Sequence, residues 1–280
     1  MSAVLFLVHP ARPAASDLAA AARVWWESRD YDVFVDRGPD PAPPRGVYDF
    51  AVSFGGDGTM LRTVQKAFAG QTPVIGINMG RMGYLTVVEP TGMETAFESL
   101  VAGDFKVEER MVLDVAIRHT ATHPPADGHG DTSFIALNEA IVERTAAGHT
   151  IRVAVDIGGR RFLTYMADGL LVCTPTGSTA YNLSARGPVV SPNMRALVLT
   201  AVAPHLVFDR SLVLGPDETV TLTLLEGQAA RLVLDGSRVV DLADGDSVLC
   251  SAAATAARLV TFGERDFHAV LRSRFSLADG

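Results

Sequence analysis

The hydrophobic pattern of this chain changes near Glu108, and that change restricts the folds that the sequence can adopt. Before Glu108, unbroken apolar runs such as 4–8 alternate with segments of helical spacing. After it, apolar and polar residues alternate with a period of two, as in 112–117 and 152–157. Unbroken runs are typical of strands buried on both faces of a parallel sheet, whereas the two-residue period is typical of antiparallel strands. We therefore predict an α/β N-terminal domain with a mostly parallel sheet, followed by an all-β C-terminal domain.

The expected elements divide the chain into an α/β (Rossmann-like) domain at 1–110, a β-rich domain at 111–262 and a C-terminal tail at 263–280. In the first domain, strands are expected at 4–8, 31–35, 49–54 and 73–77, and helices at 14–29 and 59–68. In the second domain, hairpin turns are expected at Gly158-Gly159 and Asp235-Gly236. The tail has the spacing of a helix, so we expect it to pack back on the N-terminal domain.

The composition argues against several classes of protein. The net charge of −8 repels polyanions, so we expect no nucleic-acid partner. The longest apolar stretch, 196–208, is too short to span a bilayer, and no signal peptide is recognisable, so no membrane partner is expected. Cys173 and Cys250 are the only cysteines, which favours a reducing, cytoplasmic setting. Lys66 and Lys106 are the only lysines, and the absence of GxxxxGK[ST] excludes a P-loop nucleotide site.

The first candidate site is Gly55-Gly56-Asp57-Gly58, where a strand ends and a helix is expected to begin. Glycines permit positive φ and close backbone approach, and the first N–H groups of a helix attract anions, so this turn predicts a phosphate site. A carboxylate there weakens anion binding unless it holds a metal ion or accepts a proton from an attacking hydroxyl. A tight structural turn, with Asp57 as the helix cap, explains the same residues equally well.

A second glycine-spaced turn, 78–85, follows the next strand along the chain. Neighbouring βα loops at the carboxyl edge of a parallel sheet share one crevice, so we expect this turn to lie beside the first. A purely structural turn is the alternative.

The third candidate is Asn138-Glu139, an amide beside a carboxylate at the end of the apolar run 134–137. Adjacent strand residues face opposite ways, so both reach one ligand only if the strand ends or bulges here. Together they suit a ribose diol or an adenine edge. A polar strand end is the alternative.

The segment 168–184 runs from an apolar strand into a dense cluster of small hydroxyl residues. Such residues are poor core material and good lining for a polar ligand, and Tyr181 adds a face for stacking. We expect Cys173 to be buried and inert, because it lies within the apolar strand. Ser178 has no nearby sequence partner that suggests an acyl-transfer triad.

Three histidines, His119, His123 and His129, lie in a Gly/Pro-rich loop at 119–132. No carboxylate or thiolate accompanies them at a fixed helical spacing, so we expect a polar loop rather than a metal site.

The combination of motifs resembles the NAD kinase family of the bacterial type, whose members transfer phosphate from ATP or polyphosphate to the 2'-hydroxyl of the adenosine ribose of NAD, giving NADP. The resemblance spans almost the whole chain and rests on GGDGTMLR at 55–62, NMGRMGYL at 78–85, LNE at 137–139, DGLLVCTPTGSTAYNLSARGP at 168–188, PHLVFDR at 204–210 and FHAVLRSRF at 267–275. GGDGT is shared with lipid kinases, whereas TPTGSTAY downstream of LNE is specific to NAD kinases.

The resemblance implies an active site in a cleft between the two domains, with Asp57 as proton acceptor and Mg²⁺ accompanying the donor phosphates. The residues implied to face the phosphoryl donor are Gly55, Gly56, Gly58 and Thr59. Those implied to bind NAD are Asp57, Gly58, Arg62, Asn138, Glu139, His149, Asp168, Thr179, Ala180, Tyr181, Asn182, Leu183 and Ser184. It also implies a homodimer or homotetramer.

Three residues depart from the family pattern. Arg186 stands where the family usually has Gly, Ser211 where Pro usually follows Arg, and Ser237 where Gln is usual. Arg186 matters most, because a long cation there could clash with substrate, pair with a phosphate or point to solvent.

Two other functions fit parts of the sequence. A lipid kinase shares GGDGT but needs an apolar or basic membrane-facing surface, which the sequence does not clearly show. A non-catalytic nucleotide-binding regulator is the other, and the intact Asp57 argues against it, because an idle carboxylate in an anion site only weakens binding.

Overall fold

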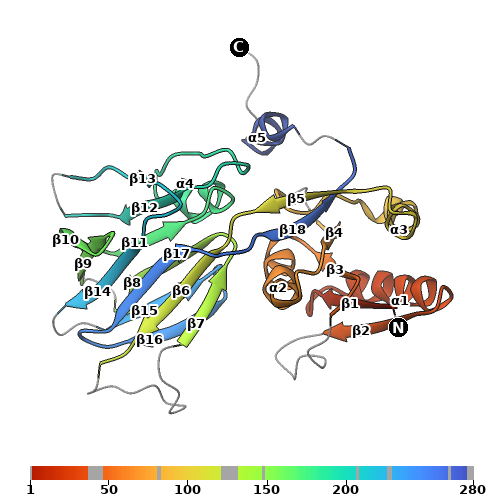
Figure 1. Ribbon diagram of the computed structural model, residues 1–280, viewed down its shortest axis with the longest axis horizontal. Coiled ribbons are helices and arrows are strands. Elements are labelled where there is room, and N and C mark those ends of the chain that lie inside the picture. Colours follow the sequence, from red (N-terminus) through yellow and green to blue (C-terminus); the bar gives the residue numbers. More distant parts are fainter. Residues whose placement is uncertain are drawn as a thin grey trace. The chain divides into compact units, whose positions relative to one another are not determined.

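The computed structural model describes residues 2–36, 47–80, 83–120, 132–146, 149–205, 208–225, 229–263 and 266–275. The chain forms two compact units, one made of 1–109 with 257–280 and the other of 110–256 (Figure 1). Each unit has its own sheet or sheets and its own core, as predicted from the change in hydrophobic pattern.

The first unit contains a six-stranded sheet in the order β2-β1-β3-β4-β18-β5, with β1 to β4 and β18 parallel. Its strands are β1 (Ser2–Val8), β2 (Tyr31–Asp36), β3 (Phe50–Gly55), β4 (Val74–Asn78), β5 (Lys106–Arg110) and β18 (Ala257–Thr261). Its helices are α1 (Pro13–Glu27), α2 (Asp57–Ala67), α3 (Met93–Ala102) and α5 (Phe267–Phe275), with short 3-10 turns η1 (Phe68–Gly70) and η2 (Pro90–Gly92).

Helices cover both faces of this sheet. Alternate residues of β4 point to opposite faces, and each contacts a different set of helices. Ile75 packs with Trp26 of α1 and Phe97 of α3 in one apolar cluster. A Cβ on the neighbouring Gly76 would instead point toward Met60 of α2, 3.1 Å from its sulfur. The unbroken apolar runs of the sequence therefore reflect strands that are buried on both sides.

The C-terminal part of the first unit begins earlier than the predicted boundary at 262/263. Strand β18 pairs in parallel with β4, with Leu259 opposite Val74, so 257–261 belong to the first sheet and not to the β domain. The residues of this segment suit a strand, and the sequence of a strand does not specify the sheet that it joins. The expected helix is α5, in the same unit, where the guanidinium of Arg274 lies 5.5 Å from the ring of Tyr84.

The second unit is built from two antiparallel sheets, in the orders β10-β9-β14-β17-β6-β7 and β13-β12-β11-β8-β15-β16. The strands are β6 (Leu113–Arg118), β7 (Thr132–Ala136), β8 (Glu139–Arg144), β9 (Ile151–Ile157), β10 (Arg160–Ala167), β11 (Gly169–Cys173), β12 (Leu197–Val202), β13 (Leu212–Leu214), β14 (Val220–Leu225), β15 (Ala230–Leu234), β16 (Arg238–Leu242) and β17 (Ser247–Ala252). Two short helices, η3 (Gly177–Thr179) and α4 (Tyr181–Ser184), follow β11.

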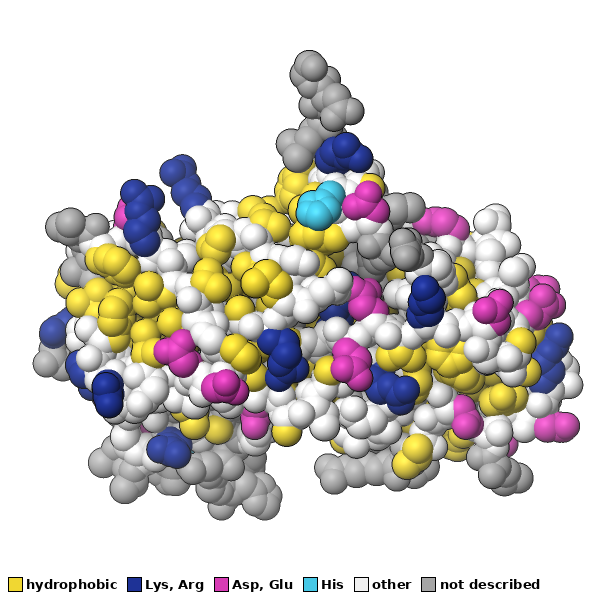
Figure 2. Space-filling view, turned by 45° about the horizontal axis from the view of Figure 1, so that its top comes forward, with side chains coloured by type: hydrophobic (Ala, Val, Ile, Leu, Met, Phe, Trp, Pro, Cys, Tyr) yellow, Lys and Arg dark blue, Asp and Glu magenta, His cyan; other side chains and the backbone are white. Residues whose placement is uncertain are grey.

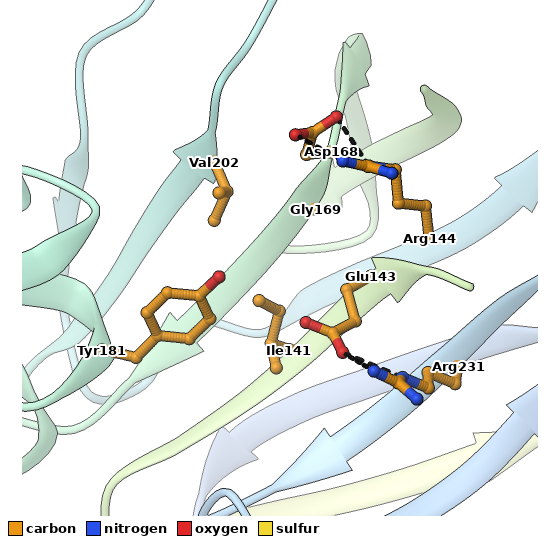
Figure 3. Close-up of a pocket in the computed structure, with 8 residues that line it drawn as sticks. All are labelled: Ile141, Glu143, Arg144, Asp168, Gly169, Tyr181, Val202 and Arg231. Carbon is orange, nitrogen blue, oxygen red and sulfur yellow. Dashed lines mark hydrogen bonds and ion pairs between the residues drawn. The ribbon is translucent and has the colours of Figure 1, made fainter. Parts of the chain in front are cut away.

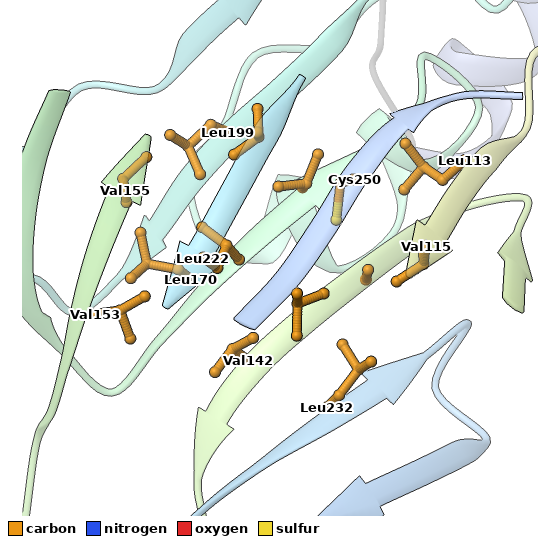
Figure 4. Close-up of a cluster of buried hydrophobic side chains, with 14 of the residues drawn as sticks. Leu113, Val115, Val142, Val153, Val155, Leu170, Leu199, Leu222, Leu232 and Cys250 are labelled. Atoms are coloured by element: carbon orange, nitrogen blue, oxygen red, sulfur yellow. The ribbon is translucent and has the colours of Figure 1, made fainter. Parts of the chain in front are cut away.

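The core of this unit lies between its two sheets (Figure 4). Val153 and Leu222 contribute from the first of them, and Val142 and Leu232 from the second. The alternation of apolar and polar residues along each strand follows from this one-sided burial. Both predicted hairpin turns are confirmed, and each has positive φ at its central residues.

The histidine-rich loop is only partly described. His119 follows β6, and its Nδ1 lies 3.1 Å from Oδ2 of the buried Asp246. His123 and His129 lie outside the described residues. Among the residues that the structure describes, no group of three or more His, Cys, Asp or Glu is placed to hold a metal ion.

The described helices include none that is long and apolar enough to cross a membrane. On the face drawn in Figure 2, basic and acidic side chains are interspersed. Such mixing gives no extended positive field on that face for a polyanion.

Candidate active site

The glycine turn after β3 lies at the carboxyl edge of the parallel sheet. Gly56 is the N-cap of α2, and none of the three glycines of the turn has a positive φ. Gly55 is required by packing, because a Cβ there would overlap the side chain of Thr59. At Gly56 and Gly58 a Cβ would meet nothing within 4 Å. The packing of the described chain thus explains Gly55, whereas Gly56 and Gly58 leave backbone exposed to open space.

Asp57 is the first residue of α2, and its carboxylate does not cap this helix. The carboxylate instead accepts hydrogen bonds from the backbone N–H groups of Tyr84, at 2.9 Å, and Leu85, at 3.1 Å. A Cβ on Gly83 would overlap this carboxylate, so glycine is needed there. The helix-cap alternative for Asp57 is therefore wrong. Two accepted bonds leave lone pairs on the carboxylate that remain available to a proton donor.

The second glycine-spaced turn lies beside the first, as predicted. Gly55 is opposite Asn78 in the parallel pairing of β3 and β4, and Met79 N donates to Gly55 O at 3.0 Å. The buried Asn78 side chain holds the turn by donating to Gly80 O, at 3.1 Å, and to Glu89 Oε1, at 2.9 Å. The buried Asn78 side chain thus fixes the backbone of this turn.

The remaining candidates of the first unit lie on α2. Thr59 is buried, and its backbone N–H donates to Gly56 O at 3.0 Å. Arg62 is half-buried and forms no hydrogen bond or ion pair with the described residues.

In the second unit, Asn138 and Glu139 are held by Asp235, which the sequence analysis treated only as a turn residue. Asp235 is buried, and its carboxylate accepts hydrogen bonds from the backbone N–H groups of Leu137, at 3.0 Å, Asn138, at 2.7 Å, and Glu139, at 3.3 Å. Asp235 has φ of 49°, the left-handed conformation that a type I' hairpin turn requires. The sequence gives no sign that Asp235 also accepts these hydrogen bonds, because the three N–H donors lie almost 100 residues away.

Glu139 is a buried carboxylate with an unfilled acceptor. Its side chain is only 6% exposed, and Oε2 has no hydrogen-bond partner among the described residues. Burial, reinforced by the charge of Asp235, raises the pKa of Glu139 to about 7, although a hydrogen bond from the backbone N–H of Tyr181 opposes this rise. A buried acceptor without a partner destabilises the fold, and Oε2 remains available to a donor from outside the described chain.

The hydroxyl-rich segment after β11 packs on the same residues. Thr174 donates from its backbone N–H to Asn138 O, at 2.9 Å, and from its hydroxyl to Leu137 O, at 2.6 Å. A Cβ on Gly177 would overlap the backbone of Asn138. The structure therefore brings together the LNE and TPTGSTAY motifs, which are more than thirty residues apart in the sequence. Cys173 is fully buried, and burial raises the pKa of its thiol, as expected for an inert cysteine.

Asn182 has a structural role. It is fully buried, and its amide donates to Ser178 O, at 3.2 Å, and to Pro188 O, at 2.9 Å. The Thr200 hydroxyl lies 2.7 Å from Asn182 Oδ1 and 2.8 Å from the Ser211 hydroxyl. The Asn182 side chain therefore holds the turn together and does not face a ligand as we expected. Ser211, one of the departures from the family pattern, takes part in this network.

Arg186 is exposed and has φ of 64°, in the left-handed region that favours glycine. This explains why a glycine is usual at its position. Its side chain forms no hydrogen bond or ion pair with the described residues, which matches the alternative in which it points to solvent. Ser237 is also exposed, in the turn between β15 and β16.

A pocket of about 220 Å³ lies beside Tyr181 (Figure 3). Its apolar lining comes from Ile141, Gly169, Val202 and the Tyr181 ring. A Cβ on Gly169 would come within 3.0 Å of the backbone of β8, so close strand packing accounts for this glycine. The pocket offers a stacking face and apolar walls to a flat ring.

Two carboxylates line the polar part of this pocket, and each is paired with an arginine (Figure 3). Arg144 donates to Asp168 from Nε, at 2.9 Å, and from Nη2, at 3.3 Å. Arg231 donates from Nε to Glu143 Oε1, at 2.9 Å. The pairs fix the carboxylates as acceptors for an amino or hydroxyl group. No sequence motif relates Arg144, Glu143 and Arg231 to Asp168, so these three residues were not predicted.

Of the other expected NAD-binding residues, Thr179, Ala180 and Leu183 are half-buried, whereas Ser184 is exposed in α4. His149 is exposed before β9 and contacts none of the candidate site residues through a hydrogen bond or ion pair within the described chain. Its expected role in NAD binding rests on a segment outside the well-marked motifs.

Known proteins match the chain in both units. Residues 44–105 match the ATP-NAD kinase N-terminal domain, and residues 137–262 match the ATP-NAD kinase C-terminal domain. The chain is 42% identical to the NAD kinase of Heliobacterium modesticaldum over 227 residues, which cover 81% of this chain and 78% of the relative. It is 35% identical to the NAD kinase of Wolinella succinogenes over 288 residues, which cover 100% and 97%. The chain belongs to the NAD kinase family.

Solved structures of this family and of a yeast NADH kinase have the same fold. An NAD kinase from Archaeoglobus fulgidus in complex with ATP has a TM-score of 0.76 and 26% identity, over 99% of this chain and 100% of that one. Yeast NADH kinase complexed with NADH has a TM-score of 0.87 and 20% identity, over 100% and 89%. The protein is therefore an NAD kinase-family enzyme, and the resemblance found in its motifs is confirmed.

Proposed function

We propose that the protein transfers the terminal phosphoryl group of ATP to the 2'-hydroxyl of the adenosine ribose of NAD, forming NADP and ADP. The observation that carries this proposal is the Asp57 carboxylate, which is fixed beside Gly56 and Gly58, where the backbone faces open space. An anion-accepting turn and a proton acceptor then occur in adjacent residues, as phosphoryl transfer to a hydroxyl requires.

In the proposed reaction, the 2'-oxygen attacks the terminal phosphorus while the bond from that phosphorus to the bridging oxygen breaks. The hydroxyl proton passes to the carboxylate of Asp57, and ADP leaves with the bridging oxygen. The N–H groups of the glycine turn stabilise negative charge on the transferring group. Mg²⁺ enters with the donor as part of the substrate and offsets the charge of its phosphates.

The second unit is proposed to bind NAD. The unfilled Oε2 of Glu139 suits a ribose hydroxyl, and we assign the side-chain amide of the neighbouring Asn138 to the same nucleotide. The pocket beside Tyr181 suits an adenine, because the ring stacks on a base while the carboxylates of Glu143 and Asp168 accept hydrogen bonds from an amino group. ATP as the donor is supported by the Archaeoglobus fulgidus relative, which was solved with ATP. Polyphosphate has the same bond between phosphorus and bridging oxygen, so it is proposed as an alternative donor.

The test is NADP formation by the purified protein with NAD, ATP and Mg²⁺, measured through an NADP-specific dehydrogenase. Parallel reactions use polyphosphate as donor and a short-chain diacylglycerol as acceptor. We expect NADP from NAD and no phosphorylated diacylglycerol. Binding of NAD without NADP formation from either donor would contradict the proposal and favour a regulator. Light scattering in the same preparation tests the proposed homodimer or homotetramer.

A further inference from the structure

Arg12 lies at the same edge of the parallel sheet as the glycine turn, although it belongs to no motif discussed above. It follows β1 and is the N-cap residue of α1. Its guanidinium donates to Met79 O, and Met79 N donates to Gly55 O at 3.0 Å. A single residue, Met79, therefore connects Arg12 with the first glycine of the candidate phosphate site.

The packing around Gly80 places the Arg12 guanidinium on the second turn. A Cβ on Gly80 would lie 2.8 Å from Arg12 Nη1. Gly80 has no positive φ, so backbone conformation does not require glycine there. The Arg12 guanidinium thus lies directly against Gly80, so a methyl group at residue 80 would displace it.

Arg12 is an exposed cation that forms no ion pair with the described residues. Arg12 thus differs from Arg23 and Lys66 of the same unit, which have acidic partners in Glu27 and Asp36. Guanidinium has five N–H donors, and the bond to Met79 uses one of them. The remaining donors suit phosphate oxygens, which arginine binds in a two-pronged geometry.

The glycine turn needs such a cation. It carries the negative charge of Asp57, and the chain has no P-loop lysine to offset the charge of a triphosphate. The net charge of −8 adds to the repulsion of a polyanionic donor.

We propose that Arg12 binds phosphate oxygens of the donor at the glycine turn and stabilises the transferring phosphoryl group. This inference rests on the proposed function, because it assigns a residue to the donor of that reaction. Met79 O holds the guanidinium in place for this task, and Gly80 leaves room for it.

The experiment measures steady-state NADP formation and the affinity for a non-hydrolysable ATP analogue with Mg²⁺. Arg12→Ala removes the cation, and Arg12→Lys keeps the charge without the two-pronged geometry. Gly80→Ala displaces the guanidinium and leaves its charge. Arg23→Ala is the matched control, because it removes an exposed arginine from α1 that is paired with Glu27.

We expect Arg12→Ala to lower kcat/KM for ATP and the analogue affinity by about 10- to 100-fold, with KM for NAD unchanged. Arg12→Lys should recover part of this loss. Gly80→Ala should weaken analogue binding in the wild-type background and have no further effect when Arg12 is already alanine. Arg23→Ala should behave as the wild type.

An equal rise in KM for ATP and for NAD in the Arg12→Ala variant would overturn the role of Arg12. An unchanged kcat/KM for ATP in the folded variant would overturn it too. The wild-type enzyme would still form NADP in either case, so the proposed function would stand. Absence of NADP from the wild-type protein would overturn the proposed function and this inference with it.

Discussion

Glu139→Gln should make the protein more stable at neutral and alkaline pH. Glu139 is buried with an unfilled acceptor, and its pKa rises from 4.5 to about 7 in the folded state. Between these values the folded state binds more protons than the unfolded state, so the free energy of unfolding falls as the pH rises. The carboxyl group's contribution is fully present below pH 4.5 and is lost as the pH passes about 7. A shift of this size corresponds to about 3 kcal/mol.

Glutamine has a similar shape and does not titrate, so the free energy of unfolding of the variant does not fall in this way as the pH rises. We expect the stability difference between Glu139→Gln and the wild type to grow by about 3 kcal/mol in favour of the variant between pH 4.5 and pH 8. Urea denaturation at several pH values, followed by circular dichroism, measures this difference. The control is Glu98→Gln, which changes an exposed carboxylate that keeps its hydration on folding.

The same variant should bind NAD less tightly, because it no longer offers a charged acceptor to a ribose hydroxyl. A stability difference that stays constant from pH 4.5 to pH 8 would refute the reasoning that Glu139 is a buried, destabilising carboxylate. So would a variant that is less stable than the wild type at pH 8.

Four further substitutions test individual parts of the site. Gly55→Ala should lower the free energy of unfolding by about 1–3 kcal/mol, because the methyl group overlaps Thr59, whereas Gly56→Ala should keep the thermal midpoint and raise KM for ATP; equal midpoints for the two variants would contradict this. Arg186→Gly should raise the free energy of unfolding by about 0.5–1 kcal/mol in urea, because it relieves a left-handed φ, and a decrease would count against that explanation. Asp235→Ala should lower the same quantity by about 2–4 kcal/mol and weaken NAD binding in calorimetry, because three backbone N–H groups lose their acceptor; unchanged NAD affinity would show that Asp235 does not position the site.

The fold could be predicted from the hydrophobic pattern to a large extent. Unbroken apolar runs such as 4–8 became strands of the parallel sheet, and alternating runs such as 152–157 became antiparallel strands. The sheet assignment of β18 could not be predicted, because the sequence of a strand indicates its burial and does not identify the neighbouring strand.

The candidate site was predictable where a motif is continuous in sequence. The glycine turn and the start of its neighbour at 78–85 lie side by side in the structure, as predicted. The role of Asp57 in holding Tyr84 was missed, because an acid at a helix start usually caps that helix.

Contacts between residues that are distant along the chain could not be predicted from the sequence. The bond from Arg144 in β8 to Asp168, the residue before β11, joins segments that are adjacent only in the folded sheet. Asn182 was expected to face the ligand, but its side-chain amide donates to two backbone carbonyls, which only the folded structure shows. In these cases a polar residue has the same sequence pattern whether it binds a ligand or holds the protein together.

The central claim is that Asp57 accepts the proton of the NAD 2'-hydroxyl. The most direct test compares turnover and NAD affinity in Asp57→Asn with those of the wild type, using the coupled NADP assay and calorimetry. We expect turnover to fall by about 10²- to 10⁴-fold while the dissociation constant for NAD changes little, because asparagine keeps an acceptor for the backbone N–H groups but takes up no proton. Near-normal turnover in a folded Asp57→Asn variant would contradict the claim.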